Sequence, residues 1–332
     1  WSFILKNNWS ESSAKKYIKK YKNIGFSKDL ALRVYTTRLL GRNKELVLHG
    51  GGNTSVKTTI KDIDGKKYNV LCVKGSGWNM ADIEPEGLPA VKLEPLLTLK
   101  KKKYLSDEDM VNFQKRNLIN IKSPNPSVET FLHAFLPFKY VDHTHADAVL
   151  NITNRPGGLN ICKKIFGNKV SIVPYVMPGF MLAKKISEVY SKNPNINCLI
   201  LMNHGIFTFA DNCKEAYDLM IKYVSKAEST IKKLKSKKIK QIKKFTTNFN
   251  PYEVAPILRG LLSNNELPIY RHSRKQALRE TDLVILAGVP CDFRLDYGRH
   301  INHKALIISI NLSKRDLYLN RKPTQGILED PG

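Results

Sequence analysis

Two histidines stand one residue apart in the segment His143-Thr144-His145, which follows an apolar stretch and precedes Ala148-Val149-Leu150. Side chains two positions apart on a strand point to the same face, so both imidazoles can bind one metal ion. A third histidine, His204, follows another apolar segment, and a carboxylate, Glu129, lies upstream. Two histidines on a strand are often only satisfied polar residues, but the added histidine and carboxylate favour a mononuclear metal site.

Two glycine- and hydroxyl-rich segments follow predicted strands. The first is Gly50-Gly51-Gly52-Asn53-Thr54-Ser55, and the second is Lys74-Gly75-Ser76-Gly77. Glycine lets the backbone come close to a ligand, and Asn, Thr and Ser supply donors for phosphate oxygens. For the first segment alone, a glycine turn between two strands is the better interpretation, and the spacing of a P-loop is absent. Because the pattern occurs twice, it favours a convergent phosphate site.

The periodicity of apolar residues predicts alternating helices and strands. Strands are expected over 46–49, 68–73, 170–176, 198–202 and 206–209. Helices are expected over 14–21, 27–41, 130–136, about 147–154 and 180–190, and after Asp211. Ser27 and Ser106 are expected as helix N-caps, and Asp211 as the N-cap of the last helix. The continuous apolar run at 198–202 predicts a strand that is buried on both faces.

The net charge of +26 could indicate a nucleic-acid-binding protein. Aromatic residues do not interleave with the lysine runs, however, and no nucleic-acid motif is present. We therefore interpret the lysines as solvated surface and expect no nucleic-acid partner. No run of 18 apolar residues occurs, which argues against a transmembrane helix. The five cysteines are scattered and lack CxxC spacing, so we expect a reducing, cytoplasmic location.

With these residues assembled, the stretch from about Trp9 to Leu262 resembles the class II (zinc-dependent) aldolase/adducin head family. The matching segments are DLALRVYTTRLLG, LVLHGGGNTSVK, VKGSGWNM, NPSVETFLHAFLPFKYVDHTHADAVL, VPYVMPGF, LMNHGIFTF and EVAPILRG. The chain looks most similar to the longer sugar-phosphate branch, typified by rhamnulose-phosphate aldolases that are often fused to a short-chain dehydrogenase. Each segment alone is unspecific, but the ordered set is highly specific.

The resemblance implies a three-layer α/β/α sandwich, a homo-tetramer and one Zn²⁺ per chain. It implies that the zinc ligands are His143, His145 and His204 and that Glu129 is the catalytic carboxylate. The implied phosphate-binding positions are Asn53, Thr54, Ser55, Ser76, Gly77 and Ser127. The implied reaction is the cleavage or formation of a ketose phosphate through an enediolate that zinc stabilises. The second acid of this reaction is not identified, and Tyr175 is a guess.

Members of the same family also act as 4-epimerases of ribulose phosphates or as dehydratases, and adducin heads have no enzyme activity. Epimerase and aldolase share the metal site, so spacing does not separate them. A non-catalytic module, either an adducin-like scaffold or a basic nucleic-acid binder, is a third alternative. The presence of all three histidines and of the carboxylate favours the lyase.

The last part of the chain, from Asn265 to Gly332, resembles the central domain of thiamine-diphosphate enzymes of the acetolactate-synthase and 2-hydroxyacyl-CoA lyase type. The matching text is RKQALRETDLVILAGVPCDFRLDYGR, ALIISINLS and EDPG. Strands over 282–287 and 305–310 are expected to be buried and parallel, as in a partial Rossmann-like α/β fragment. We therefore expect domains over 1–262 and 263–332.

The family binds thiamine diphosphate and Mg²⁺ mainly through its other two domains. The fragment is thus not expected to be active alone, and it would use that cofactor only as part of a complete enzyme. A true fusion, a join made during gene assembly and a nucleotide-binding appendage all remain open as explanations of this segment.

Overall fold

A computed structural model describes residues 5–48, 51–62, 65–233 and 278–329 of the chain. The chain divides into two compact units, Trp1–Lys235 and Ser236–Gly332. The expected boundary between residues 262 and 263 lies outside the described residues, as does the EVAPILRG segment at 253–260.

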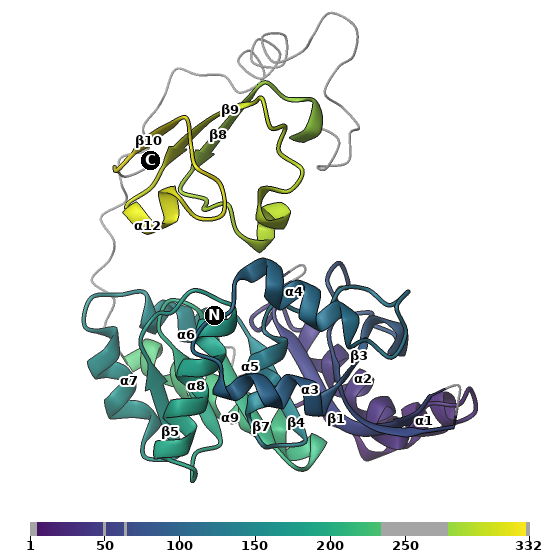
Figure 1. Ribbon diagram of the computed structural model, residues 1–332. Helices are drawn as coiled ribbons and strands as arrows, with labels where there is room; N and C mark the ends of the chain where they lie inside the picture. The colour runs from purple at the N-terminus through teal and green to yellow at the C-terminus, as the bar shows by residue number, and fades with distance from the viewer. Residues whose placement is uncertain (1–4, 49–50, 63–64, 234–277, 330–332) are drawn as a thin grey trace, which may run out of the picture. The chain divides into compact units, whose positions relative to one another are not determined.

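The first unit is built on a seven-stranded sheet with the order β3-β2-β1-β4-β7-β6-β5 (Figure 1). All neighbouring strands pair antiparallel except β5 and β6, which are parallel. The strands are β1 (Asn53–Lys61), β2 (Lys67–Val73), β3 (Ala90–Lys92), β4 (Tyr140–Thr144), β5 (Val170–Val173), β6 (Cys198–Leu201) and β7 (Gly205–Ala210). The predicted strand at 198–202 is confirmed, and every residue of β6 is buried.

Helices cover both faces of this sheet, which confirms the predicted three-layer α/β/α sandwich (Figure 1). Alternate residues of β6 belong to different cores, with Leu199 and Leu201 on one face and Cys198 and Ile200 on the other. The first face packs on α3 (Leu93–Thr98), α4 (Asp107–Arg116), α5 (Thr130–Phe135) and α8 (Phe180–Lys192). The opposite face packs on α1 (Glu11–Lys22), α2 (Lys28–Gly41), α6 (Asp147–Thr153), α7 (Gly158–Phe166) and α9 (Cys213–Lys233).

The predicted helix starts are confirmed in two cases and wrong in one. The hydroxyl oxygens of Ser27 and Ser106 accept hydrogen bonds from the first turns of α2 and α4. Asp211 is not the N-cap of α9, because Asn212 accepts from the N–H groups of Lys214 and Glu215 at 2.9 and 3.2 Å. The carboxylate of Asp211 instead accepts from the backbone N–H of Lys139 at 3.0 Å.

The strand predicted over 46–49 is also wrong within the described residues. The backbone N–H groups of Leu46 and Val47 both donate to the carbonyl oxygen of Asn43 at 3.0 Å, which makes a turn. The side chain of Asn43 accepts from Glu45 N–H at 3.0 Å and holds the same turn. Local hydrogen bonding by an asparagine side chain therefore prevails over the apolar run.

The second unit contains three parallel strands in the order β10-β9-β8. They are β8 (Leu283–Ala287), β9 (Leu306–Ile310) and β10 (Gln325–Ile327), with a short helix, α12 (Lys314–Leu317). The predicted parallel pairing of the first two is confirmed. The expectation that both are fully buried is wrong for the described residues, because alternate side chains are exposed; Ile285 is 58% and Leu306 is 56% exposed.

In the part of the chain that the structure describes, no helix has both the length and the apolar character needed to cross a bilayer.

Candidate metal centre

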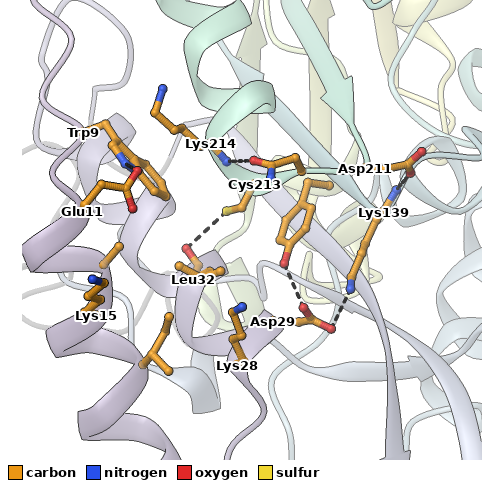
Figure 2. A pocket seen from close by; sticks show the side chains of 14 residues that line it. Trp9, Glu11, Lys15, Lys28, Asp29, Leu32, Lys139, Asp211, Cys213 and Lys214 are labelled. Atoms are coloured by element: carbon orange, nitrogen blue, oxygen red, sulfur yellow. Dashed lines mark hydrogen bonds and ion pairs between the residues drawn. The ribbon is translucent and has the colours of Figure 1, made fainter.

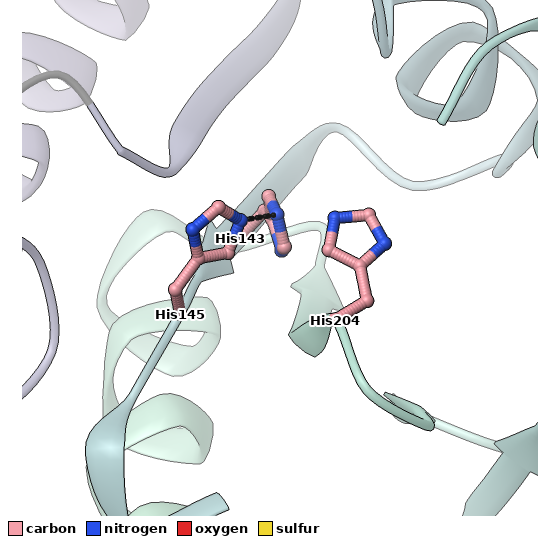
Figure 3. A group of neighbouring side chains, drawn as sticks. All are labelled: His143, His145 and His204. Atoms are coloured by element: carbon pink, nitrogen blue, oxygen red, sulfur yellow. Dashed lines mark hydrogen bonds between the residues drawn. The ribbon is translucent and has the colours of Figure 1, made fainter. Parts of the chain in front are cut away.

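Three histidines converge where β4 ends and β7 begins (Figure 3). His143 is on β4, where it pairs with Asn53 of β1 on one side and with Phe207 of β7 on the other. His145 follows directly after the strand ends at Thr144. Figure 3 shows the rings of His143 and His145 side by side, with the ring of His204 facing them.

His204 reaches this position through the tight connection between β6 and β7. Its N–H donates to the carbonyl oxygen of Leu201 at 3.2 Å, and Asn203 adopts a left-handed φ of 57°. The next residue is Gly205, where an added Cβ would lie 2.5 Å from the carbonyl oxygen of Thr144 and 3.1 Å from Cε1 of His143. Only glycine allows this close approach of the turn to the strand that carries the other two histidines.

The spacing of the three rings suits one metal ion. One ligand atom from each histidine lies within 4.8 Å of the others, and Nε2 of His143 is 3.0 Å from Nε2 of His145. Zinc–nitrogen bonds of about 2.0–2.1 Å in tetrahedral geometry place two ligand nitrogens about 3.4 Å apart. The observed separations lie on both sides of that value, so the three histidines are grouped closely enough to share one ion.

The tautomer of His143 leaves its outer nitrogen free for a ligand bond. Its Nδ1 lies 3.0 Å from the carbonyl oxygen of Ile206, which can only accept, so Nδ1 carries the proton. The ring is completely buried and is stacked on Phe207, with centroids 3.9 Å apart. Such a carbonyl contact is what fixes metal-binding histidines in proteins.

Glu129 faces the same point from the other side. It is the residue before α5 and is only 4% exposed. Its Oε2 lies 3.4 Å from His143 Nε2, and its Oε1 lies 3.3 Å from His204 Nε2. Oε1 accepts no hydrogen bond from the described residues. A buried carboxylate oxygen without a hydrogen bond, facing imidazoles, is the arrangement that a bound cation would stabilise.

Burial keeps His143 and His145 neutral. Burial, followed by the proximity of His204, lowers the pKa of His145 from 6.5 to about 4. The pKa of His143 lies well below 6.5, because the ring is buried and because His145 and His204 are close. A neutral imidazole has the lone pair that a metal ligand needs, so the site is ready to bind a cation at neutral pH.

The second glycine segment lies beside Glu129. Ser76 N–H donates to the carbonyl oxygen of Asn125 at 2.8 Å, and Ser127 N–H donates to the carbonyl oxygen of Lys74 at 3.1 Å. These bonds place the exposed Ser76-Gly77 loop against the segment that carries Ser127 and Glu129. The predicted phosphate role of Ser76, Gly77 and Ser127 remains a prediction.

The residues of the first glycine segment instead make packing contacts and hydrogen bonds inside the fold around β1. Gly52 has a left-handed φ of 67°, and a Cβ there would lie 2.8 Å from the carbonyl oxygen of His143. Thr54 is fully buried, and its hydroxyl lies 2.6 Å from that of Thr37 on α2. Ser55 is also buried, with its hydroxyl 2.8 Å from Nδ1 of His133. The predicted phosphate contacts of Thr54 and Ser55 are thus corrected for their side chains, which are engaged inside the fold.

Asn53 and His133 belong to the site in a way that the sequence did not indicate. Asn53 donates to Oε2 of Glu129 at 2.7 Å and to the hydroxyl of Ser127 at 3.1 Å. Nε2 of His133 lies 2.5 Å from the amide oxygen of Asn53. The four-residue spacing of Glu129 and His133 was the available signal, but their link through a residue of β1 depends on the tertiary fold. Tyr175 is 50% exposed, and its predicted role remains a prediction.

A separate cavity of about 440 Å³ contains none of these residues (Figure 2). It is lined mainly by α1, α2 and the start of α9. Asp29 lies 2.8 Å from Nζ of Lys139 and accepts from the hydroxyl of Tyr140 at 3.2 Å. Glu11 accepts from the indole N–H of Trp9 at 2.8 Å.

The comparisons with known proteins agree with the fold. The family model of the class II aldolase and adducin N-terminal domain matches residues 31–231. This chain therefore belongs to the class II aldolase and adducin family. The N-terminal class II aldolase domain of a conserved Thermoplasma acidophilum protein is 43% identical, with a TM-score of 0.61. That likeness covers 68% of this chain and 99% of the other.

The curated relatives match two separate parts of this chain. An uncharacterized oxidoreductase of Bacillus subtilis, YuxG, is 40% identical over 198 residues, which are 60% of this chain and 29% of the relative. The 2-hydroxyacyl-CoA lyase 2 of Xenopus laevis is 51% identical over 70 residues, which are 21% of this chain and 11% of the lyase. The chain thus spans less than a third of the length of each of these relatives.

Proposed function

We propose that the first unit is a metal-dependent aldehyde-lyase that cleaves or forms a phosphorylated ketose. The observation that carries the proposal is the buried cluster of three histidines and Glu129 at one end of the central strands. The exposed Ser76-Gly77 loop beside it supplies the place for a phosphate. Membership of the class II aldolase and adducin family supports the same reaction class.

The residues fit one divalent cation, which we propose is Zn²⁺ held by His143, His145 and His204. When bound, the ion would supply the positive charge that stabilises an enediolate. Glu129 would move the proton on the substrate carbon, since it is a buried carboxylate with one oxygen free of hydrogen bonds. The hydroxyls of Ser76 and Ser127 and the N–H group of Gly77 would hold the phosphate and so fix which carbon faces Glu129.

The first test is metal content. We expect purified protein to bind about one Zn²⁺ per chain and His143→Ala and His204→Ala each to abolish this binding. The control is Glu129→Gln, which keeps the three imidazoles and should keep the ion while losing the reaction. Stoichiometric zinc in both histidine variants would remove the metal assignment.

The second test is the reaction itself. A panel of ketose 1-phosphates and pentulose 5-phosphates is incubated with zinc-loaded protein, and the products are analysed. Triose phosphate plus an aldehyde supports the lyase, whereas an epimeric pentulose phosphate supports the 4-epimerase, which would use the same metal site. Neither product, together with salt-sensitive binding to DNA or RNA by metal-free protein, would favour the non-catalytic alternative.

We further propose that the first unit assembles as a homo-tetramer, which light scattering after size exclusion tests directly. For the second unit we propose no thiamine-dependent activity of its own, because its match covers only 11% of the Xenopus lyase. Calorimetry with thiamine diphosphate and Mg²⁺ is expected to give no binding, and a measurable affinity would contradict this. We also propose that the boundary between the two domains lies near residue 262.

A further inference from the structure

Four buried polar side chains form a hydrogen-bonded chain that ends on Glu129. Nδ1 of His133 lies 2.8 Å from the hydroxyl of Ser55, and Nε2 lies 2.5 Å from the amide oxygen of Asn53. The amide nitrogen of Asn53 then donates to Oε2 of Glu129 at 2.7 Å. His133 is completely buried, and Asn53 and Glu129 are 7% and 4% exposed.

The direction of each hydrogen bond in this chain follows from the chemistry of its ends. The carboxylate of Glu129 only accepts, so the amide nitrogen of Asn53 must face it. That nitrogen also donates to the hydroxyl of Ser127 at 3.1 Å, which uses both of its protons. The amide oxygen of Asn53 therefore accepts from His133, whose proton lies on Nε2. Nδ1 of His133 then accepts from the hydroxyl of Ser55.

The surroundings of His133 hold the ring in this neutral form. The ammonium group of Lys57 donates to the backbone carbonyl of His133 at 2.8 Å, and it also donates to Leu136 and Phe138 in the following loop, at 2.7 Å each. Phe207 packs edge-on against the ring, with centroids 5.7 Å apart. A second positive charge beside Lys57 would be unfavourable in this buried place.

We propose that His133 is a positioning residue, which orients the amide of Asn53 so that this amide holds one carboxylate oxygen of Glu129. The other oxygen, Oε1, is then left facing His204 and the proposed reacting carbon. Without the imidazole N–H, the amide oxygen of Asn53 loses the donor that holds it, and only the bonds of its nitrogen to Glu129 and Ser127 still orient the side chain. The consequence for catalysis rests on the proposed function, whereas the hydrogen-bond directions do not.

Two substitutions separate positioning from packing. His133→Gln can place an amide N–H near the position of Nε2 and keep the donor to Asn53, whereas His133→Phe fills the space without any donor. Phe135→Leu is the control, because it removes buried volume from the same helix without touching the chain of hydrogen bonds. All three are first compared with the wild type by denaturant unfolding and by zinc content.

The readout that needs no activity is the ¹⁵N spectrum of the histidine rings and asparagine amides in zinc-free protein. We expect the proton of His133 on Nε2 and slow solvent exchange of the Asn53 amide in the wild type and in Phe135→Leu. We expect the Asn53 amide to exchange rapidly in His133→Phe and to be protected again in His133→Gln. A proton on Nδ1 of His133 in the wild type would overturn the proposal.

The activity readout is proton exchange at the carbon of dihydroxyacetone phosphate, the three-carbon product that cleavage of a ketose 1-phosphate releases. In His133→Phe we expect kcat to fall about 100-fold, with zinc content and KM nearly unchanged, because a misplaced carboxylate slows proton transfer. His133→Gln should recover at least about tenfold of that loss, and Phe135→Leu should keep the wild-type rate. If the wild type shows no exchange at all, the lyase proposal fails while the ¹⁵N test still decides the positioning role. A full wild-type rate in His133→Phe would overturn that role in catalysis.

Discussion

The guanidinium of Arg33 lies 2.5 Å from the carboxylate of Asp142, and both side chains are completely buried. Asp142 immediately precedes His143 on β4, and it points toward α2, on the face of the sheet opposite the metal site. Arg33 also donates to the backbone carbonyl of Ser55 on β1 at 3.2 Å. The ion pair therefore fixes α2 to the two neighbouring strands directly behind His143.

Removing one member of this ion pair is expected to destabilise the protein strongly. Asp142→Leu would leave the Arg33 charge buried without a partner, which we expect to lower the free energy of unfolding by about 3–5 kcal/mol. The double variant Arg33→Met with Asp142→Leu should recover most of the loss, because no buried charge remains. Urea unfolding measures the free energy of unfolding of the single variant and of the double variant. Lys214→Ala, which breaks the exposed ion pair with Asp218, is the control and should change the midpoint little.

Gly205→Ala is expected to weaken metal binding more than it weakens the fold. Its Cβ would lie 2.5 Å from the carbonyl oxygen of Thr144, so the His204 turn must move away from His143 and His145. We expect zinc affinity to fall by about tenfold or more, as measured by competition with a chelating dye. Gly167→Ala is the control, since Gly167 also has a positive φ, of 75°, but no atom lies within 4 Å of its added Cβ. Equal affinities in the two variants would contradict the steric argument.

Lys57→Met is expected to destabilise the first unit. The ammonium group donates to three backbone carbonyls, of His133, Leu136 and Phe138, at 2.7 to 2.8 Å. Removing it leaves those acceptors without this donor, and we expect the free energy of unfolding to fall by about 3 kcal/mol or more. Lys61→Met, an exposed position on the same strand, should stay within about 0.5 kcal/mol of the wild type. Matching unfolding midpoints for the two variants would refute the role of these bonds.

The metal-free protein is expected to lose stability as the pH falls below about 6.5. Burial lowers the pKa of His145 to about 4, so the unfolded chain binds more protons than the native chain between about pH 4 and 6.5. The stability that the neutral form of His145 contributes is therefore fully present above about pH 6.5, and it is lost as the pH falls toward about 4. His145 alone would account for up to about 3 kcal/mol.

The measurement is urea unfolding of zinc-free protein across that pH window. His145→Gln removes one titrating group and should make the decline shallower. His303→Gln is the control, because this histidine belongs to the second unit and is not a member of the cluster. An unchanged slope in His145→Gln would show that burial does not hold this imidazole neutral.

The clustering of His143, His145 and His204 could be predicted from the sequence because each signal is local. His143 and His145 share a face through the two-residue repeat of a strand, and His204 stands directly after a buried strand. The same repeat explains a wrong expectation: Thr54 lies between Asn53 and Ser55, so its side chain points to the opposite face and contacts Thr37. The sequence alone did not show which of the side chains of Asn53, Thr54 and Ser55 point toward the site.

The hydrogen-bonded chain from Ser55 to Glu129 could not be predicted in this way. It requires β1 to pair with β4 in the register Asn53–His143, and it requires α5 to lie over both strands. Register across distant strands depends on packing of the whole sheet. The helix start at Asn212 was missed for a smaller reason, because Asp211 is an equally good capping residue by type and only the observed contacts separate the two.

The position of β4 between β1 and β7 bears on when a growing chain could first bind the proposed metal ion. His143 is on β4 and His145 follows its end, but His204 belongs to the turn that precedes β7, which is synthesised later. A chain interrupted before His204 would have β4 with one open edge and only two of the three histidines. Under the proposed function, metal binding would therefore wait for the turn between β6 and β7, and a bound ion would report that this turn is in place.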